Sequence, residues 1–493
     1  MAASKMMNLS IKMSSSTPSI TPPSSPSSSS VNLPVRTIPG SYGLPLIGPL
    51  SDRLDYFWFQ GPETFFKKRM EEHKSSVFRT NVPPAFPFLG SVNPNMIAVL
   101  DCKAFAHLFD MDLVEKKDIL IGDFMPSTSF TGDMRVGVYL DTTEPQHSQV
   151  KSFAAHILKR SSSVWVSELI SNLDIMWGTI EKEVTSNGTS SFLLPLQKCI
   201  FRFLTKSLYG ADPMKSSEIG EKGHIMLDTW LALQLLPTQK LGVLPQPLEE
   251  ILFHSFAYPF FLVSGGYNKL FEFVKTEGKE VVEIGMTQYG LSQDETIHNL
   301  LFILGFNAFG GFSVFLPSLL ISLGGDQSGL QEKLRKEVKE KVGSSSLSFS
   351  SVKEMELVNS FVYETLRVSP PVPFQYGRAR KDFVLSSYDS AFQIKKGELL
   401  CGYQPLAMKD PKVFDDPETF VADRFTKENG RELLNYLYWS NGPQTGTPAT
   451  SNKQCSAKDI VVLTASLLVA DVLIRYDSFT VSSGSVTAVE KAK

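Results

Sequence analysis

Residues 440–473, SNGPQTGTPATSNKQCSAKDIVVLTASLLVADVL, place Cys455 between a polar loop and a long apolar helix. A lone cysteine beside such a helix is usually a small hydrophobic side chain. However, the amides of a helix N-terminus, with Lys453 and Lys458 nearby, would lower a thiol pKa and stabilise the thiolate. A thiolate suits a metal ligand or a nucleophile, and the local sequence leaves both interpretations open.

Cysteine and histidine usage narrows the classes of site. Four widely spaced cysteines form no CxxC pair, which disfavours both a disulfide framework and a zinc knuckle. Seven histidines include no HExxH motif, so a histidine-held metal would need ligands from remote segments. The formal net charge of -3 excludes nucleic acid as a partner, because phosphate binding needs a clustered excess of Lys and Arg.

The first 50 residues contain no Asp or Glu, and residues 14–30 consist almost wholly of Ser, Thr and Pro. Such a segment cannot bury enough apolar surface to fold. We predict that residues 1–35 form a disordered leader resembling a chloroplast transit peptide, the alternative being a plain disordered tail. Residues 36–493 are predicted to form one domain, since no internal linker or repeat is apparent.

The predicted fold class is mainly α with a minor β part. Pro- and Gly-interrupted strands are expected within residues 75–101 and 371–400, while helical periodicity dominates residues 103–341 with breaks at 141–145 and 186–188. Residues 300–325 carry no charge over a length that could span a bilayer. Because Asn307, Gly310, Gly311 and Pro317 interrupt this segment, we predict a buried central helix.

A helix is also predicted from Ser351 to Arg367, opened by a capping box between Ser351 and Glu354. Within it, Glu364 and Arg367 lie at i and i+3 on one face and can form an ion pair. Taken alone, an exposed pair that contributes little stability is the better interpretation.

Read in order, three motifs point to a family. ETLR at 364–367, FVADRF at 420–425 and a cysteine opening a C-terminal helix resemble the late core of the haem-thiolate cytochrome P450 superfamily. The resemblance implies a single-domain P450 fold over everything after the leader. It also implies that Glu364, Arg367 and Arg424 form a buried ion network, and that Cys455 is the axial ligand of haem b.

Two departures narrow the resemblance. The cysteine loop carries extra residues and has Ala457 where the usual pattern has glycine. The central helix reads GFNAFGG at 305–311 and lacks the acid–alcohol pair with which monooxygenases deliver protons to oxygen. Both features, with NGPQTGTP and LLNYLYWSNGP, resemble the plant fatty acid hydroperoxide branch, which comprises allene oxide synthases, divinyl ether synthases and, most similar here, hydroperoxide lyases.

This branch implies a plastid enzyme that rearranges 13-hydroperoxides of linoleic or linolenic acid without O₂, a reductase or a nicotinamide cofactor. Asn307 is expected to hydrogen-bond the hydroperoxide, the alternative being a satisfied polar group in a buried helix. The synthases typically have Phe at the position of Leu120, so Leu120 favours cleavage into a six-carbon aldehyde and a twelve-carbon oxo-acid; core packing is the alternative. An allene oxide synthase, a divinyl ether synthase and a haem-binding sensor without turnover remain open.

Five further expectations concern the cofactor and the substrate cavity. Lys116 and Lys453 resemble the family's contacts to haem propionates, and Phe124, Phe306 and Phe309 are expected to line an apolar substrate cavity together with Leu120. The predicted partner is the fatty acid hydroperoxide. Peripheral association with a plastid membrane is left open.

Overall fold

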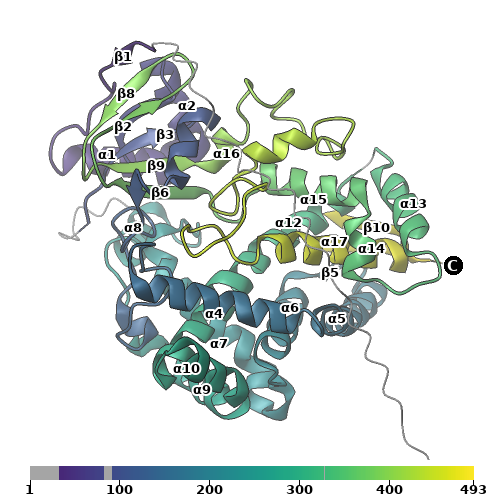
Figure 1. Cartoon of the computed structure of the whole chain (residues 1–493). Coiled ribbons are helices and arrows are strands. Elements are labelled where there is room, and N and C mark those ends of the chain that lie inside the picture. Colours follow the sequence, from purple (N-terminus) through teal and green to yellow (C-terminus); the bar gives the residue numbers. More distant parts are fainter. Residues whose placement is uncertain (1–32, 83–91, 327, 483, 493) are drawn as a thin grey trace, which may run out of the picture.

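The computed structural model describes residues 33–82, 92–326, 328–482 and 484–492. A sheet-rich part carrying the first helices occupies one end, and the remaining helices form the larger body (Figure 1). The expected mainly α fold with a minor β part is confirmed. The principal helices are α1 (Ile47–Leu54), α2 (Pro62–His73), α3 (Cys102–Phe105), α4 (Pro145–Ser161), α5 (Trp165–Asn187), α6 (Leu193–Tyr209), α7 (Ser217–Leu235), α8 (Gln246–Phe253), α9 (Phe261–Glu277), α10 (Lys279–Tyr289), α11 (Gln293–Phe302), α12 (Gly310–Gly324), α13 (Leu330–Val342), α14 (Phe349–Lys353), α15 (Glu356–Val368), α16 (Gln404–Ala407) and α17 (Lys458–Arg475).

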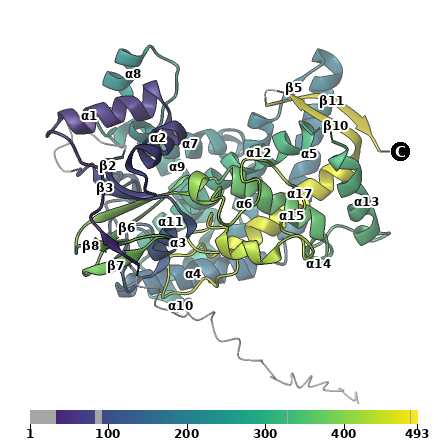
Figure 2. The same ribbon diagram turned by 90° about the horizontal axis from the view of Figure 1, so that it is seen from above.

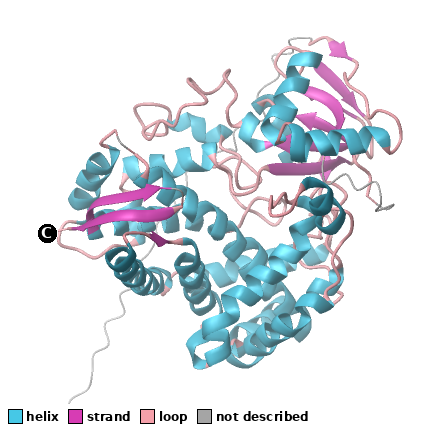
Figure 3. Cartoon of the chain, turned by 180° about the vertical axis from the view of Figure 1, so that it is seen from behind, coloured by secondary structure: helices cyan, strands magenta, loops and turns pink. Residues whose placement is uncertain are grey.

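Three small sheets account for the strands. The largest has the order β2-β3-β9-β6-β4, in which only β3 and β9 run parallel. A second sheet, β1-β8-β7, lies beside it, and the third, β10-β11-β5, lies at the far end of the helical body (Figure 3). The strands are β1 (Val35–Arg36), β2 (Val77–Asn81), β3 (Asn95–Val99), β4 (Val114–Glu115), β5 (Ser190–Ser191), β6 (Phe374–Ala379), β7 (Phe383–Ser386), β8 (Ala391–Ile394), β9 (Leu399–Tyr403), β10 (Tyr476–Ser482) and β11 (Ser485–Lys491).

The uncharged central segment forms one helical run of α11, the π-helix η6 (Ile303–Phe309) and α12. By length and composition Gln293–Gly324 could cross a bilayer. Instead it runs through the middle of the molecule and contacts α6, α15 and α17 (Figure 2). Phe312, Phe315 and Leu319 are each at most 4% exposed, as expected for a core helix.

Two predicted boundaries need correction. The capping box joins Ser348 and Ser351 at the start of the short helix α14, whereas Glu354 ends that helix and α15 begins only at Glu356. Hydroxyl side chains at both positions satisfy the first-turn amides, so Ser351 fills the role expected of a Glu at that offset.

The leader, predicted as residues 1–35, lies almost wholly outside the described residues. Its last residue, Val35, pairs with Ala391 in the β1–β8 ladder. The C-terminal β10–β11 hairpin was not predicted, because its alternating pattern is short and partly polar.

Candidate functional site

The cysteine lies in a tightly bonded loop before α17. The backbone N–H of Cys455 donates to the Ser440 carbonyl at 2.9 Å, and the Lys458 N–H donates back to the Cys455 carbonyl at 3.2 Å. The backbone N–H of Ala457 also donates to the thiol sulfur. Cys455 is half-buried, whereas the other three cysteines are buried. The backbone of Cys455 is therefore held in a fixed position.

The side chain of Gln454 fixes the fold of this loop. Its amide nitrogen donates to the Pro443 carbonyl at 2.7 Å and to Ser440 Oγ at 3.2 Å. A Cβ at Gly442 or Gly446 would lie 3.0 or 2.8 Å from this side chain, so both glycines make room for it. The extra residues of the loop thus serve to enclose Gln454.

The electrostatics of the thiol are balanced between opposing effects. Burial raises the pKa of the Cys455 thiol, while the Ala457 amide and the ammonium groups of Lys151 and Lys458 lower it. In the haem-free protein the effect of burial prevails, so the pKa of the Cys455 thiol lies above its ordinary value. A bound metal cation would complete the positive environment that a thiolate needs.

Two buried lysines approach the same loop from one side. Lys116 Nζ donates to Asn441 Oδ1 at 2.6 Å, and Lys453 Nζ donates to the carbonyls of Gly137 and Leu140 at 3.0 and 2.7 Å. Burial lowers the pKa of Lys116 to about 7, assisted by the charge of Lys453, and burial lowers that of Lys453 to about 8. Among the described residues neither ammonium forms an ion pair with a carboxylate.

Uncompensated buried cations are costly unless an anion joins them. A haem carries two carboxylates on one edge, so Lys116 and Lys453 fit its propionates, and Cys455 fits its iron.

The central helix is loosely packed at one place. A Cβ at Gly311 would meet no atom within 4 Å, and Val314, on the next turn, is 53% exposed. This side of the central helix is therefore not fully packed against other described residues.

The predicted ion network is buried. Glu364 and Arg367 have no exposed side-chain surface and form a bidentate pair with both N···O distances at 2.7 Å. Arg424 Nε donates to both Glu364 oxygens at 3.2 Å, and the Val421 N–H donates to Oε1 at 2.8 Å. The exposed-pair interpretation is therefore wrong. The network joins α15 to the segment that precedes the cysteine loop.

Asn307 lies in η6, where the Gly310 N–H donates to the Gly305 carbonyl in a π-type bond. Its side chain is exposed although its helix runs through the interior, and it has no hydrogen-bond partner among the described residues. The alternative of a satisfied buried amide therefore fails. Single-turn π segments often occur at functional sites, and here one carries the only amide of the GFNAFGG motif.

The expected apolar lining divides into two groups. Leu120 and Phe306 are half-buried, and the Phe306 ring stacks on Phe302 with centroids 4.7 Å apart. Phe309 is completely buried and Phe124 is 3% exposed, so both pack within the core. The expected role of Phe309 and Phe124 as cavity lining stays a prediction.

Three site residues were not identified from the sequence. Lys151, on α4, donates to the Gln454 carbonyl at 2.9 Å and so connects that helix to the cysteine loop. Asn441 orients the Lys116 ammonium and donates to the Lys453 carbonyl at 3.0 Å. Burial lowers the pKa of His147 to about 4, with the nearby lysines acting in the same direction. No local motif marks these residues, because their partners are remote in sequence.

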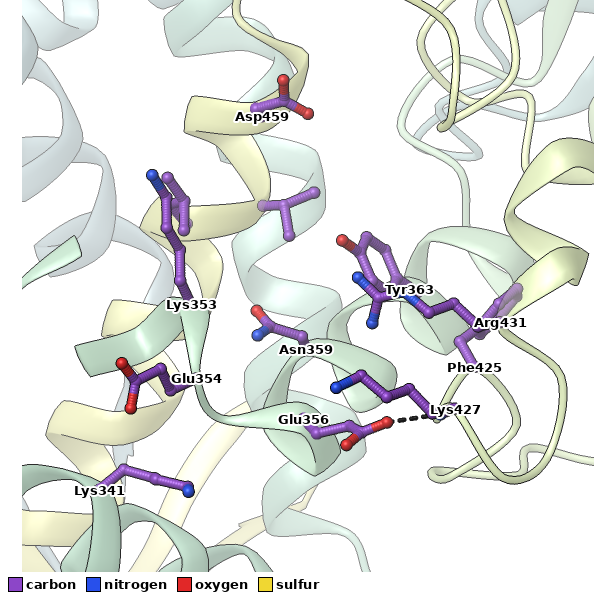
Figure 4. Close-up of a pocket in the computed structure, with 12 residues that line it drawn as sticks. Lys341, Lys353, Glu354, Glu356, Asn359, Tyr363, Phe425, Lys427, Arg431 and Asp459 are labelled. Carbon is purple, nitrogen blue, oxygen red and sulfur yellow. Dashed lines mark hydrogen bonds between the residues drawn. The ribbon is translucent and has the colours of Figure 1, made fainter. Parts of the chain in front are cut away.

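A hollow of about 570 Å³ lies elsewhere, between α14, α15 and the start of α17 (Figure 4). Its rim carries both signs of charge, and the Lys427 N–H donates to Glu356 there. None of the predicted site residues lines it. We interpret it as a solvated surface depression that is separate from the cysteine site. Its lining consists of Lys341, Lys353, Glu354, Glu356, Asn359, Tyr363, Phe425, Lys427, Arg431, Asp459, Val462 and Leu463.

Comparison with known proteins gives matches over nearly the whole chain. Residues 294–445 match the family model described as Cytochrome P450. A fatty acid hydroperoxide lyase, chloroplastic, of Solanum lycopersicum is 66% identical over 94% of this chain and 98% of its own length. A linolenate hydroperoxide lyase, chloroplastic, of Arabidopsis thaliana is 63% identical over 96% and 95%. An allene oxide synthase, chloroplastic, of Linum usitatissimum is 43% identical over 95% and 87%.

Proposed function

The chain belongs to the cytochrome P450 family, in the group that contains these lyases and synthases, and we propose that it is a chloroplast fatty acid hydroperoxide lyase. The observation that carries the proposal is the 66% identity to a lyase over 98% of that relative, against 43% to a synthase. The substrate class is a polyunsaturated fatty acid hydroperoxide. The preferred substrates are the 13-hydroperoxides of linoleic and linolenic acid.

The stoichiometry needs no second reactant. A six-carbon aldehyde and a twelve-carbon oxo-acid together contain every atom of an eighteen-carbon hydroperoxide. When bound, haem b with a thiolate ligand would supply an iron that gives up one electron as the O–O bond breaks and regains it from the resulting radical. Neither O₂ nor a reductase partner is required, which agrees with the missing acid–alcohol pair in GFNAFGG.

The loop around Gln454 supports the assignment of Cys455 as the iron ligand. Hydrogen bonds at Ser440 and Pro443 hold the loop before any cofactor binds, so little conformational entropy is lost on ligation. The ammonium groups of Lys116 and Lys453 would hold the propionates. Their pKa values, about 7 and about 8, rise when carboxylates approach, so binding is coupled to uptake of protons near neutral pH.

The unpartnered amide of Asn307 supports a role in holding the hydroperoxide. It can donate to the peroxide oxygen and fix the direction in which the oxygen atoms separate. Because its side chain is bound to none of the described residues, no existing hydrogen bond has to break when the substrate arrives. Leu120 would leave an aliphatic wall near the reacting chain, which favours chain cleavage over formation of an allene oxide.

Product analysis tests the proposal. The full chain, reconstituted with hemin, is given 13-hydroperoxylinolenate under anaerobic conditions without reductant, and products are separated by gas chromatography. We expect equal amounts of aldehyde and oxo-acid with loss of the conjugated-diene absorbance. Ketols derived from an allene oxide would instead assign the chain to the synthases. Haem binding without loss of the diene would assign it to the sensors.

A further inference from the structure

The segment that carries Leu120 has a carboxylate at each end. Residues 118–123 read DILIGD, so three apolar side chains and a glycine lie between Asp118 and Asp123. Ile119 is 6% exposed and Ile121 is half-buried, and both pack against an apolar cluster drawn from α2, β2, β3, β6 and β9. Leu120 is not among the described side chains that pack against this cluster or against the main core. The core therefore holds both neighbours of Leu120, and the backbone between them directs the Leu120 side chain.

This backbone bends at two places. Asp118 has a positive φ of 49° and donates its N–H to the Tyr139 carbonyl at 3.0 Å. The backbone groups of Ile121 and Phe124 exchange hydrogen bonds at 3.3 and 3.1 Å, which closes a tight turn with Gly122 at a φ of 59°. Asp tolerates a positive φ better than most residues, but surrounding contacts must still maintain it. Both bends thus depend on what the segment contacts.

Each terminal carboxylate pairs with an arginine from another part of the chain. Arg378, on β6, donates to Asp123, and its second terminal nitrogen donates to the Gly397 carbonyl at 3.1 Å. Arg135 Nε donates to Asp118 Oδ1 at 3.1 Å. The side chains of Arg378 and Asp123 are 27% and 18% exposed, whereas that of Asp118 is 46% exposed. The pair at Asp123 is therefore the better shielded of the two, and it ties the turn 121–124 to the sheet.

The size of this interaction suits a local role. A partly exposed ion pair changes an equilibrium by roughly two- to fivefold, which is small against the stability of a whole folded chain. The fold does not depend on it. For a turn of four residues at the surface of the sheet, the same factor decides how often the turn is open, because local segments open with much smaller free energies than the whole protein.

We propose that Asp123, through its pair with Arg378, is a positioning residue for Leu120 and so a determinant of the products. The inference rests on the proposed function, in which Leu120 forms an aliphatic wall beside the reacting chain. While the turn 121–124 is closed, the backbone gives the Leu120 side chain one direction. When the turn opens, the wall moves, and the reacting chain is no longer confined to the geometry that leads to cleavage. Arg135 holds the other end of the segment through Asp118.

The first measurement is hydrogen exchange of peptides that cover residues 117–126, in the full chain reconstituted with hemin. Asp123→Asn removes the charge and keeps the size of the side chain, so exchange should become roughly two- to fivefold faster. The matched control is Glu168→Gln, on α5 at the other end of the molecule (Figure 1), because the Glu168 side chain is 17% exposed and pairs with Lys206 at 3.0 Å. The control should exchange in this segment as the unmodified chain does.

The second measurement is the ratio of cleavage products to all other products from 13-hydroperoxylinolenate. Asp123→Asn should lower this ratio roughly two- to fivefold with an unchanged haem absorption spectrum, and Glu168→Gln should leave it constant. Arg378→Met should give the same ratio as Asp123→Asn, and the double variant should be no lower than either, because all three remove one interaction. In a chain that already carries Leu120→Ala, Asp123→Asn should have no further effect.

Several results would overturn the inference. Unchanged exchange in Asp123→Asn would show that the pair does not hold the turn. Faster exchange with a constant product ratio would show that the turn does not direct the reaction. An equal fall in the ratio with and without Leu120→Ala would mean that Asp123 acts by another route than Leu120. Circular dichroism and the haem spectrum establish that each variant is folded.

The proposed function can fail separately. If the unmodified chain forms ketols derived from an allene oxide, the chain is a synthase. Faster exchange and an altered product ratio in Asp123→Asn would still support the positioning role, because neither measurement depends on which product dominates in the unmodified chain.

Discussion

Replacing Glu364 with glutamine removes one charge from the centre of the buried network without changing its shape. The carboxylate receives two hydrogen bonds at 2.7 Å from Arg367, two at 3.2 Å from Arg424 and one at 2.8 Å from the Val421 backbone. The amide of glutamine can accept at only one of its two terminal atoms. One guanidinium N–H is then left facing an NH₂ group, and two buried cations lose their counter-charge.

The expected cost follows from the burial. Glu364 and Arg367 have no exposed side-chain surface and Arg424 has 6%. Breaking such a pair by removing one partner costs about 3–5 kcal/mol, a large share of the roughly 5–15 kcal/mol that stabilises a folded protein. Because m rises with protein size, we take a value of about 5 kcal/mol per M, with which the midpoint of urea unfolding would fall by about 0.6–1 M.

The assay is urea unfolding followed by circular dichroism, with Glu418→Gln as the matched control. Glu418 also pairs with two cations, Lys67 and Lys409, but its side chain is 56% exposed. Exposed pairs contribute about 0–1 kcal/mol, so the control midpoint should move by a few tenths of 1 M at most. Equal shifts for both variants would refute the reasoning, because burial would then not decide the strength of the network.

Four further predictions concern the site. Cys455→Ser should eliminate the thiolate haem absorption spectrum and all activity, and an unaltered spectrum would remove the ligand assignment. Asn307→Ala should keep haem but slow turnover by a factor of about 100, the usual range for losing one oriented donor; unchanged turnover would return the residue to a structural role. Leu120→Phe should raise the share of allene oxide products on chromatography, and a constant ratio would count against that position. Because burial lowers the pKa of Lys116 from 10.5 to about 7, the haem-free folded protein binds fewer protons than the unfolded chain between those values, so its melting temperature should rise with pH across that window and the rise should shrink in Lys116→Met.

Much of the fold was predictable because its signals are local. The breaks before α4 and after α5 were found from Pro145 and from Gly188, which has a positive φ of 74° at the helix end. Strands β6 to β9 follow from the run after Pro371. In contrast, the starts of α14 and α15 were misplaced, because Ser348 and Ser351 offer equivalent caps and only packing selects between them.

The site was less predictable because its residues meet through space. The pairing of Glu364 with Arg367 follows from helix geometry, but its complete burial depends on Arg424, which lies 57 positions beyond Arg367. Lys151 lies about 300 positions from the loop that it holds. Phe309 and Phe306 look alike in sequence, and only the packing of the central helix distinguishes a core residue from a half-buried one.

The C-terminal strands of the sheet β10-β11-β5 support the central helix, because β10 packs against α12. A Cβ on Gly324, the last residue of α12, would lie 2.5 Å from a Val481 side-chain atom, so strand β10 rests directly against that helix end. A chain that ended just after α17 would therefore contain every residue expected to hold the haem. It would lack strand β10, which packs against the end of the helical run that carries Asn307. Such a shortened product is expected to be cleared by plastid proteases, although no catalytic group is missing from it.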